Sequence, residues 1–415
     1  MKKTIIVVAS ALALCAGAFA QDSKPAFKWY GFVRNYFTLD TRENVAGTED
    51  FFMYLPKDQS IQADGTDANQ VTTFRFAAIT SRLGVDVTGY EIKDWKVAAK
   101  LEADFYAGLS GSTGTAYFRL RQAYFTLAKN DISFKIGQAW HPMAADMPDV
   151  FSLNTGAPFG PFSRTPEVIM DYDLGSGTTL TAAAIWQMQY TSTGPDGASA
   201  NYIKYGCIPE FYLGLNYKSD NFLARAGVDI LSISPSHYAY EGKIRKDRLT
   251  TVSPFVYAQY KSGKFSVKAK SIYAQAGEHM NLNGGYAVSS YGDDGSTNYT
   301  PTRNLSSWLS MSYAPDANWL LVLFGGYVKN FGTKDEILSR SMLYFSKNSF
   351  SNLNSMYRIT PSVIYNMGKI AFGLEYEMTS ARYGSWGATD THALATKDLH
   401  WVTNNRVQMM VKYTF

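Results

Sequence analysis

The sequence of 415 residues predicts an all-β protein, a 16-stranded antiparallel transmembrane β-barrel with an inward-folded third loop. Aromatic residues make up 15% of the chain and charged residues only 18%, whereas ordinary soluble domains carry about 25% charged residues. Alternating apolar and polar residues recur along the whole chain. No stretch after residue 20 has 18 consecutive apolar residues, so strands rather than helices are expected to cross a membrane.

The first 20 residues have the pattern of a secretory signal peptide. Two lysines follow Met1, an apolar run extends from Ile5 to Leu14, and a small-x-small cleavage motif ends at Ala20. A lipoprotein signal ending at Cys15 is a weaker alternative, because a bulky leucine precedes that cysteine. We therefore expect residues 1–20 to be a signal peptide and residues 21–415 to form a single transmembrane β-barrel domain.

The clearest strand covers residues 95–106. One parity carries Trp, Val, Ala, Leu, Ala and Phe, and the other carries Lys, Ala, Lys, Glu, Asp and Tyr. Successive side chains of a strand point to opposite faces. One face of this strand therefore needs water and the other needs an apolar environment, which is the requirement of a barrel wall between lipid and a wet lumen.

The same pattern predicts sixteen strands, an even number as in bacterial single-chain barrels. Their connections alternate between tight turns and long loops, which places both termini on the periplasmic side. A soluble β-sandwich or propeller is the alternative, but no repeat of 40–50 residues is present. The predicted strands are 27–38, 71–89, 95–106, 116–128, 132–141, 166–173, 178–190, 209–217, 222–231, 251–261, 264–276, 305–314, 318–331, 355–366, 369–382 and 401–415.

The last strand alternates clearly from Val407 to Phe415. Its apolar parity is expected to face lipid or a neighbouring subunit, and its other parity includes Arg406 and Lys412. A strand that ends on phenylalanine resembles the C-terminal strand of bacterial outer-membrane barrels. We therefore expect Phe415 to act as an assembly signal.

The polar parity of the strands is expected to line a water-filled channel. Basic residues outnumber acidic ones on this parity, and a cationic lumen raises the local concentration of anions. The alternative for each charge is an ion pair with a neighbouring strand that only stiffens the wall. The cations expected to line the pore are Arg34, Arg82, Arg119, Arg121, Lys135, Arg225, Arg358 and Arg406, with Lys28, Lys96, Lys100, Lys268, Lys270 and Lys412 on the same parity. The expected anions are Glu102, Asp104, Glu375 and Glu377, with Asp86, Glu167, Asp171 and Asp229.

The segment 142–165 is the third long connection and is expected to be a constriction loop. It is rich in Met and Phe as well as Pro and Gly. Apolar residues in a loop need a surface to pack against, and the inside of the barrel wall would supply one. Folded inward, the segment would place Asp146, Asp149 and Arg164 at the constriction. A loop that caps a neighbouring subunit is the alternative.

Several short motifs, in order along the chain, resemble the DcaP-type porin family. They include Ser81-Arg82-Leu83-Gly84, Lys100-Leu101-Glu102-Ala103-Asp104-Phe105, Arg119-Leu120-Arg121-Gln122-Ala123-Tyr124, Gly137-Gln138-Ala139-Trp140-His141-Pro142, Asn154-Thr155-Gly156-Ala157-Pro158-Phe159, Gly325-Gly326-Tyr327-Val328-Lys329-Asn330, Tyr357-Arg358-Ile359-Thr360-Pro361 and Glu375-Tyr376-Glu377.

The resemblance implies a 16-stranded, usually trimeric outer-membrane porin whose inward third loop matches residues 142–165. Some members are linked to small dicarboxylate-like anions. One departure is Gln122, where the family pattern suggests histidine; by parity, Gln122 is expected to face away from the lumen. No long N-terminal coiled coil is present, so a homotrimer would rest on the barrel walls, with strands one to five and sixteen as the expected interface.

The expected function is passive diffusion of small hydrophilic solutes through the bacterial outer membrane, with a preference for anions such as small carboxylates. The expected partners are these solutes, outer-membrane lipids and two further copies of the chain. A surface-binding or adhesive barrel with long outer loops is the alternative. No Gly-x-Ser-x-Gly nucleophile elbow is present, so we expect no enzyme, no catalytic residues, no cofactor and no metal. After loss of the signal peptide the net charge is small, which does not favour nucleic-acid binding.

Overall fold

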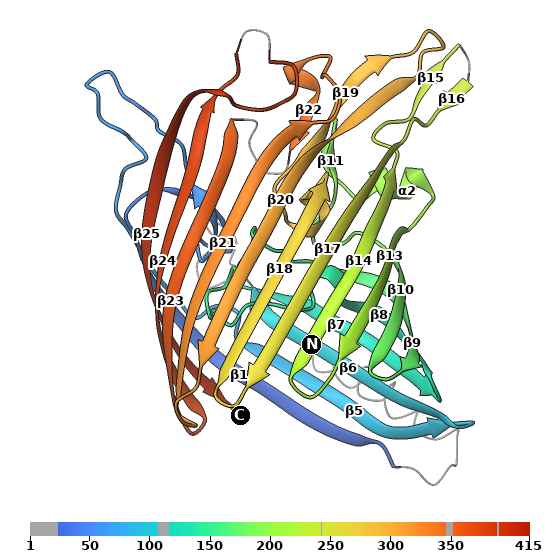
Figure 1. The fold of residues 1–415 in the computed structure, drawn as a ribbon, viewed down its shortest axis with the longest axis vertical. Coiled ribbons are helices and arrows are strands. Elements are labelled where there is room, and N and C mark those ends of the chain that lie inside the picture. Colours follow the sequence, from blue (N-terminus) through green and yellow to red (C-terminus); the bar gives the residue numbers. More distant parts are fainter. Residues whose placement is uncertain (1–23, 107–115, 242, 346–351, 388–389) are drawn as a thin grey trace, which may run out of the picture.

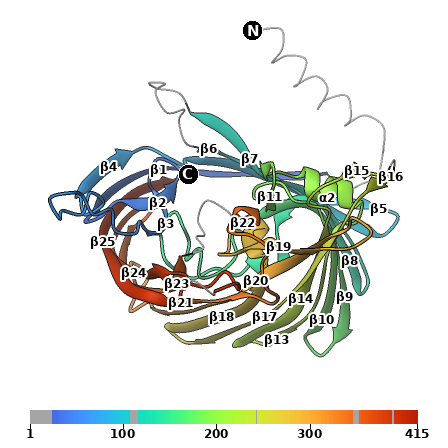
Figure 2. The ribbon, with the colours of Figure 1, turned by 90° about the horizontal axis from the view of Figure 1, so that it is seen from above.

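The computed structural model describes residues 24–106, 116–241, 243–345, 352–387 and 390–415. The predicted signal peptide lies outside these residues and stays a prediction. Within them, strands dominate and form one antiparallel sheet that closes on itself (Figures 1 and 2). Closure comes from pairing of the last long strand with the first, from Phe32 opposite Thr414 to Asp40 opposite Arg406.

The described residues place sixteen strands around the barrel, and each matches a predicted one. The second strand is split into two pieces, β4 and β5, which both pair with β1. The barrel strands are β1 (Ala26–Asp40), β4 (Thr73–Ala77), β5 (Arg82–Ile92), β6 (Trp95–Tyr106), β7 (Tyr117–Lys129), β8 (Ile132–Trp140), β9 (Arg164–Gly175), β10 (Thr178–Ile185), β13 (Glu210–Lys218), β14 (Phe222–Ile233), β17 (Leu249–Ser262), β18 (Phe265–Gln275), β20 (Thr297–Tyr313), β21 (Trp319–Thr333), β23 (Leu353–Met367), β24 (Ile370–Ser385) and β25 (Lys397–Thr414).

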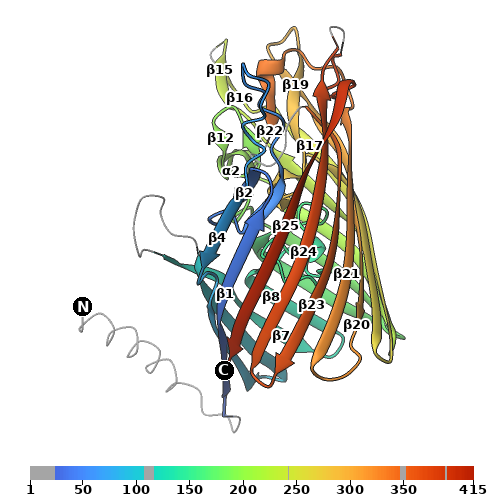
Figure 3. The same ribbon diagram turned by 90° about the vertical axis from the view of Figure 1, so that its left-hand side faces the viewer.

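The long loops leave the barrel at one end and contain the short elements, some of which fold back inside the barrel, whereas the described connections at the other end are tight turns (Figures 1 and 3). The chain enters β1 and leaves β25 at the end with the tight turns, as the even strand number requires. The short elements are β2 (Asn44–Gly47), β3 (Phe52–Pro56), β11 (Thr193–Gly194), β12 (Gly197–Ala198), α2 (Asn201–Gly206), β15 (Tyr238–Tyr240), β16 (Lys243–Arg245), β19 (Gly285–Tyr291), β22 (Leu343–Phe345) and the 3-10 helices Pro142–Ala144, Gly277–Met280 and Arg340–Met342.

The outer face of the barrel is apolar and ends in aromatic rings. Near the tight turns, the rings of Trp319 and Tyr365 lie 4.7 Å apart. Towards the long loops, the rings of Tyr357 and Trp401 lie 5.3 Å apart. Aromatic rings at both borders of an apolar band are typical of barrels that sit in a membrane. No helix among the described residues is long and apolar enough to cross a membrane.

The outer face also contains a glycine that the fold requires. A Cβ atom on Gly31 would lie 2.5 Å from the carbonyl oxygen of Arg82 and 2.5 Å from the ring of Phe415. Gly325 lies on the outer face of β21, and nothing would lie within 4 Å of a Cβ there. We expect Gly31→Ala to lower the free energy of unfolding by about 1–3 kcal/mol through overpacking.

Gly325→Ala is the matched control and should leave stability nearly unchanged. Urea unfolding of the two refolded barrels in detergent would measure the difference. Equal stabilities of the two variants would contradict the assigned contact between β1, β5 and the ring of Phe415.

Candidate functional site: the lumen and its inward loops

The third long loop, L3 (residues 141–163), folds into the barrel, which confirms that prediction. Lys270 Nζ donates to the carbonyl oxygens of Met143 (2.7 Å) and Asp146 (2.6 Å). Arg225 Nε lies 2.8 Å from Asp146 Oδ2, and Lys268 pairs with Asp149. Asp146 and Asp149 therefore attach L3 to β14 and β18.

The other half of L3 is bound by the strands near the barrel seam. The backbone N–H of Phe151 donates to Glu375 Oε2 (3.2 Å), and the side-chain amide of Asn154 donates to Glu377 Oε2 (3.0 Å). Arg358 Nη1 donates to the carbonyl oxygen of Ala157 (3.1 Å). These buried charges were predicted to line the pore, and the structure shows them bound to L3, Glu375 and Arg358 through its backbone and Glu377 through the side chain of Asn154.

Arg164 belongs to the wall rather than to L3, because β9 begins at this residue. Its guanidinium carbon lies 4.6 Å from the ring centre of Trp140, and the side chain is buried. Lys135 lies in the lumen over the ring of Tyr124, 5.4 Å from its centre. Because β9 begins at Arg164, L3 ends at residue 163, two residues before the predicted end at residue 165.

A second loop also enters the barrel, and the sequence analysis did not anticipate it. In L1 (residues 41–72), β3 is buried against β24 and β25. Arg358 Nη2 donates to the carbonyl oxygen of Tyr54 (3.0 Å), and Arg406 Nη2 donates to that of Asp50 (2.8 Å). The signal was the apolar run Phe51–Leu55, which needs a packing surface as L3 does.

L1 and L3 share one apolar cluster with the sixth loop, L6 (residues 276–296). Phe52 and Phe162 lie edge to face with ring centres 5.1 Å apart. The backbone N–H of Phe162 donates to the carbonyl oxygen of Met280 in L6 (2.9 Å). Buried residues of the three loops belong to one hydrophobic cluster with residues of the barrel strands, and segments of the loops lie within the ring of strands when the barrel is seen from above (Figure 2).

The part of the barrel wall formed by β5 to β7 contains a β-bulge at Arg121. Ala103 pairs with Leu120, and Glu102 pairs with Gln122, so Arg121 is the extra residue. A bulge changes the parity of the side chains that follow it. Gln122 therefore faces the lumen, where its amide lies 3.4 Å from Glu102 Oε1. The prediction that Gln122 faces away was wrong for this reason.

Three of the arginines that were expected to line the pore lie together on this wall. Arg119 makes a two-point contact with Asp104, with both N–O distances 3.0 Å. Arg121 lies between the two acids, 2.7 Å from Glu102 Oε1 and 2.7 Å from Asp104 Oδ2. Arg82 Nη1 reaches Glu102 Oε1 at 3.5 Å. Three arginines thus share two carboxylates.

Two further cations face the lumen beside this cluster. Arg34 on β1 and Lys412 on β25 are register partners. Arg34 donates to Thr80 Oγ1, and its Nε is buried without a hydrogen-bond partner. Neither cation forms an ion pair with a carboxylate of the described residues. Like charges directly opposite each other on neighbouring strands are unfavourable, so this pair favours a negatively charged ligand.

A cavity of about 540 Å³ separates this basic wall from L3. Arg34, Arg82, Arg121 and Lys412 line one side. The rest of the lining comes mainly from L3 and from β21, β23 and β25, with apolar residues prominent. The lining residues that these elements contribute are Met147, Asp149, Val150, Phe151, Ser152, Leu153, Thr155, Leu320, Ile364, Asn366 and Met410. A basic surface facing a largely apolar one suits an amphipathic anion.

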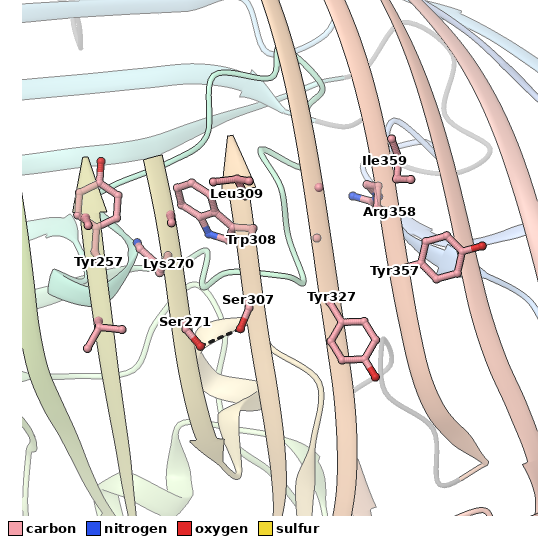
Figure 4. Close-up of a pocket in the computed structure, with 15 residues that line it drawn as sticks. Tyr257, Lys270, Ser271, Ser307, Trp308, Leu309, Tyr327, Tyr357, Arg358 and Ile359 are labelled. Atoms are coloured by element: carbon pink, nitrogen blue, oxygen red, sulfur yellow. Dashed lines mark hydrogen bonds between the residues drawn. The ribbon is translucent and has the colours of Figure 1, made fainter. Parts of the chain in front are cut away.

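A separate groove of about 620 Å³ lies in the part of the barrel wall formed by β17 to β23 (Figure 4). Small residues on the outer face of these strands leave room for the groove. The hydroxyl oxygens of Ser271 and Ser307 lie 2.8 Å apart there. Leu309, Tyr327 and Ile359 border it on the outside and are exposed. This groove faces away from the channel and is not part of the lumen site.

Comparison with solved structures finds the same architecture. The outer-membrane channel DcaP of Acinetobacter baumannii is 22% identical, with a TM-score of 0.66 over 96% of this chain and 99% of that chain. The anion-selective porin from Comamonas acidovorans is 11% identical (TM-score 0.54, 94% and 100% covered). OmpT of Vibrio cholerae is also 11% identical (TM-score 0.53, 96% and 100% covered). No protein-family model and no curated protein sequence matches the chain. The chain therefore has the porin-type barrel fold, and its similarity to the DcaP channel agrees with the resemblance found in the sequence.

Proposed function

We propose that this protein is an outer-membrane porin that lets small hydrophilic solutes diffuse passively and prefers anions such as small carboxylates. The apolar band with aromatic borders supports the membrane location. The observation that carries the anion preference is the pair Arg34 and Lys412, two cations that lack carboxylate partners among the described residues and face one cavity.

The charge balance around the cavity supports the same conclusion. Arg82, Arg119 and Arg121 contact Glu102 and Asp104 on the basic wall, and Arg34 and Lys412 add two further cations at the cavity. Asp149, the other acid at the cavity, is already paired with Lys268. A surplus of positive charge between low-dielectric walls concentrates anions. Arginine adds a planar fork that matches a carboxylate.

The proposal includes a homotrimer and no catalytic activity. One solved structure with the same fold is described as a trimer form. The exposed apolar residues on the outer face of the barrel offer area for contact between copies. The adhesive alternative would not require the cationic cavity in the lumen.

Conductance in a planar lipid bilayer tests the proposal. Under a tenfold KCl gradient, we expect open channels whose reversal potential shows that chloride is more permeant than potassium. Insertion in groups of three conductance steps would support the trimer. A reversal potential that favours potassium would overturn the anion preference, and a protein that folds but does not conduct would favour the adhesive alternative.

A further inference from the structure

Four buried side chains from distant parts of the chain meet beside the base of L3. They are His141 at the start of L3, Glu210 at the start of β13, Asp229 in β14 and His279 in L6. At most 2% of each residue is exposed. The ligating atoms of His141, Glu210 and Asp229 all lie within 4.8 Å of one another. This cluster lies apart from the residues that line the cationic cavity.

The hydrogen bonds of the two imidazoles assign different roles to them. The backbone N–H of Met143 donates to His141 Nδ1 (3.2 Å), so Nε2 carries the hydrogen and donates to Glu210 Oε1 (2.7 Å). His279 Nδ1 lies 3.1 Å from the carbonyl oxygen of Ala276, which can only accept. In neutral His279, Nε2 therefore presents a lone pair.

That lone pair faces two carboxylates. His279 Nε2 lies 3.5 Å from Glu210 Oε1 and 3.6 Å from Asp229 Oδ2. His279 Nε2, Glu210 Oε2 and both carboxylate oxygens of Asp229 are buried without a hydrogen-bond partner. Buried polar atoms without partners are costly and rare in native proteins. Electron-rich atoms that converge in this way need a cation between them.

A proton on His279 is one candidate for this cation. Burial would lower the pKa of His279, but the negative charges of Glu210 and Asp229 raise it well above its usual value. The spacing argues against a proton alone, because charge-assisted N–H···O bonds are about 2.7–2.9 Å long. Tetrahedral ligands at about 2.0–2.1 Å from a Zn²⁺ ion are about 3.3–3.4 Å apart, which is close to the observed 3.5 and 3.6 Å.

We propose that His279 Nε2, Glu210 and Asp229 bind a divalent transition-metal ion, with Zn²⁺ as the best fit to one nitrogen and carboxylate oxygens. Ca²⁺ and Mg²⁺ prefer shells made of oxygen alone. His141 is a positioning residue, because its Nε2–H orients the Glu210 carboxylate, as residues behind metal ligands commonly do. The ion would join L6 to β13 and β14 next to the base of L3. No short sequence motif reveals this site, since its residues are separated by long stretches of chain.

Metal binding to the purified full-length protein in detergent tests this site. The wild type is stripped with EDTA, its folded state is checked by the heat-dependent shift in gel mobility, and Zn²⁺ is added in a calorimetric titration. We expect one equivalent per chain, retained after gel filtration and replaceable by Co²⁺ with a visible absorption band. Glu210→Gln and Asp229→Asn should each weaken binding at least tenfold, and His141→Asn should weaken it about 10–100-fold.

His400→Gln is the matched control, because it removes another histidine–carboxylate pair, His400 Nε2 and Asp58 Oδ1 at 2.8 Å. Zn²⁺ binding should be unchanged in this variant. Stripped wild type that stays folded but binds no Zn²⁺ would overturn the proposal and leave an ion-pair cluster of two histidines and two acids. Binding that survives in both Glu210→Gln and Asp229→Asn would overturn it as well. If those variants do not fold, the wild-type titration decides by itself.

Discussion

Replacing Arg34 and Lys412 together with glutamine is expected to remove most of the anion preference of the channel. A unit charge in water contributes about 1 kcal/mol to a monovalent ion about 4 Å away, which is about a fivefold change in local concentration. The permeability ratio of chloride to potassium should therefore fall by about fivefold or more in dilute KCl. The effect should shrink in 1 M KCl, where the Debye length is only about 3 Å.

Lys96→Gln is the control for this double variant. Lys96 is expected on the lumen parity of β6, but it is exposed near the tight turns and does not line the cavity. Reversal potentials of the wild type, the double variant and Lys96→Gln in the same salt gradients would give their permeability ratios of chloride to potassium. A double variant with the wild-type permeability ratio would show that the unpaired cations do not set selectivity.

Arg358→Met is expected to free both inward loops and widen the channel. The buried guanidinium donates to the backbone of L1 at Tyr54 and of L3 at Ala157, and its Nε lies 3.6 Å from Glu377 Oε1. Removal leaves the buried Glu377 carboxylate without this counter-charge, and the carbonyl groups of Met53, Tyr54 and Ala157 without their donor. Loss of one partner of a buried ion pair costs about 3–5 kcal/mol. We expect a loss of stability of this order, together with a larger and noisier single-channel conductance.

Urea unfolding and single-channel recording would measure the two effects. Arg382→Met is the matched control, because Arg382 lies on the next strand and its guanidinium carbon is 5.8 Å from the ring centre of Trp401. Adding Glu377→Gln to Arg358→Met should restore part of the stability, since the buried charge is then removed. Wild-type conductance and stability in Arg358→Met would mean that other contacts hold the loops.

The barrel could be predicted from sequence because a period of two is a local property. The alternation of apolar and polar residues within each strand identifies its two faces. The lumen-facing and the lipid-facing sides of the wall therefore follow from parity alone. Prediction from parity fails where a strand has one extra residue, as β7 has at Arg121. The position of this bulge is set by the pairing of β7 with β6 and not by composition. Gln122 is the residue whose face was misassigned for this reason.

The site was predictable in part for the same reason. Parity placed Arg34, Arg82 and Arg121 in the lumen, and the structure brings them to one cavity. Parity does not reveal which partner a lumen residue meets. Arg358 and Arg406 therefore looked like pore residues, whereas the structure shows them bound to the backbone of inward loops. The inward path of L1 was missed because its many polar residues obscured the short apolar run.

The split in the second strand affects the mechanics of the basic wall. β4 ends at Ala77 and β5 begins at Arg82, so β1 has no strand partner on that side between Tyr36 and Phe32. At this level the backbone N–H of Arg34 donates instead to the hydroxyl of Ser81 (3.0 Å). One side-chain hydroxyl is easier to displace than a ladder of paired amides. We therefore expect this part of the wall, next to Arg34 and Lys412, to open more easily than the hydrogen-bonded ladders above and below it.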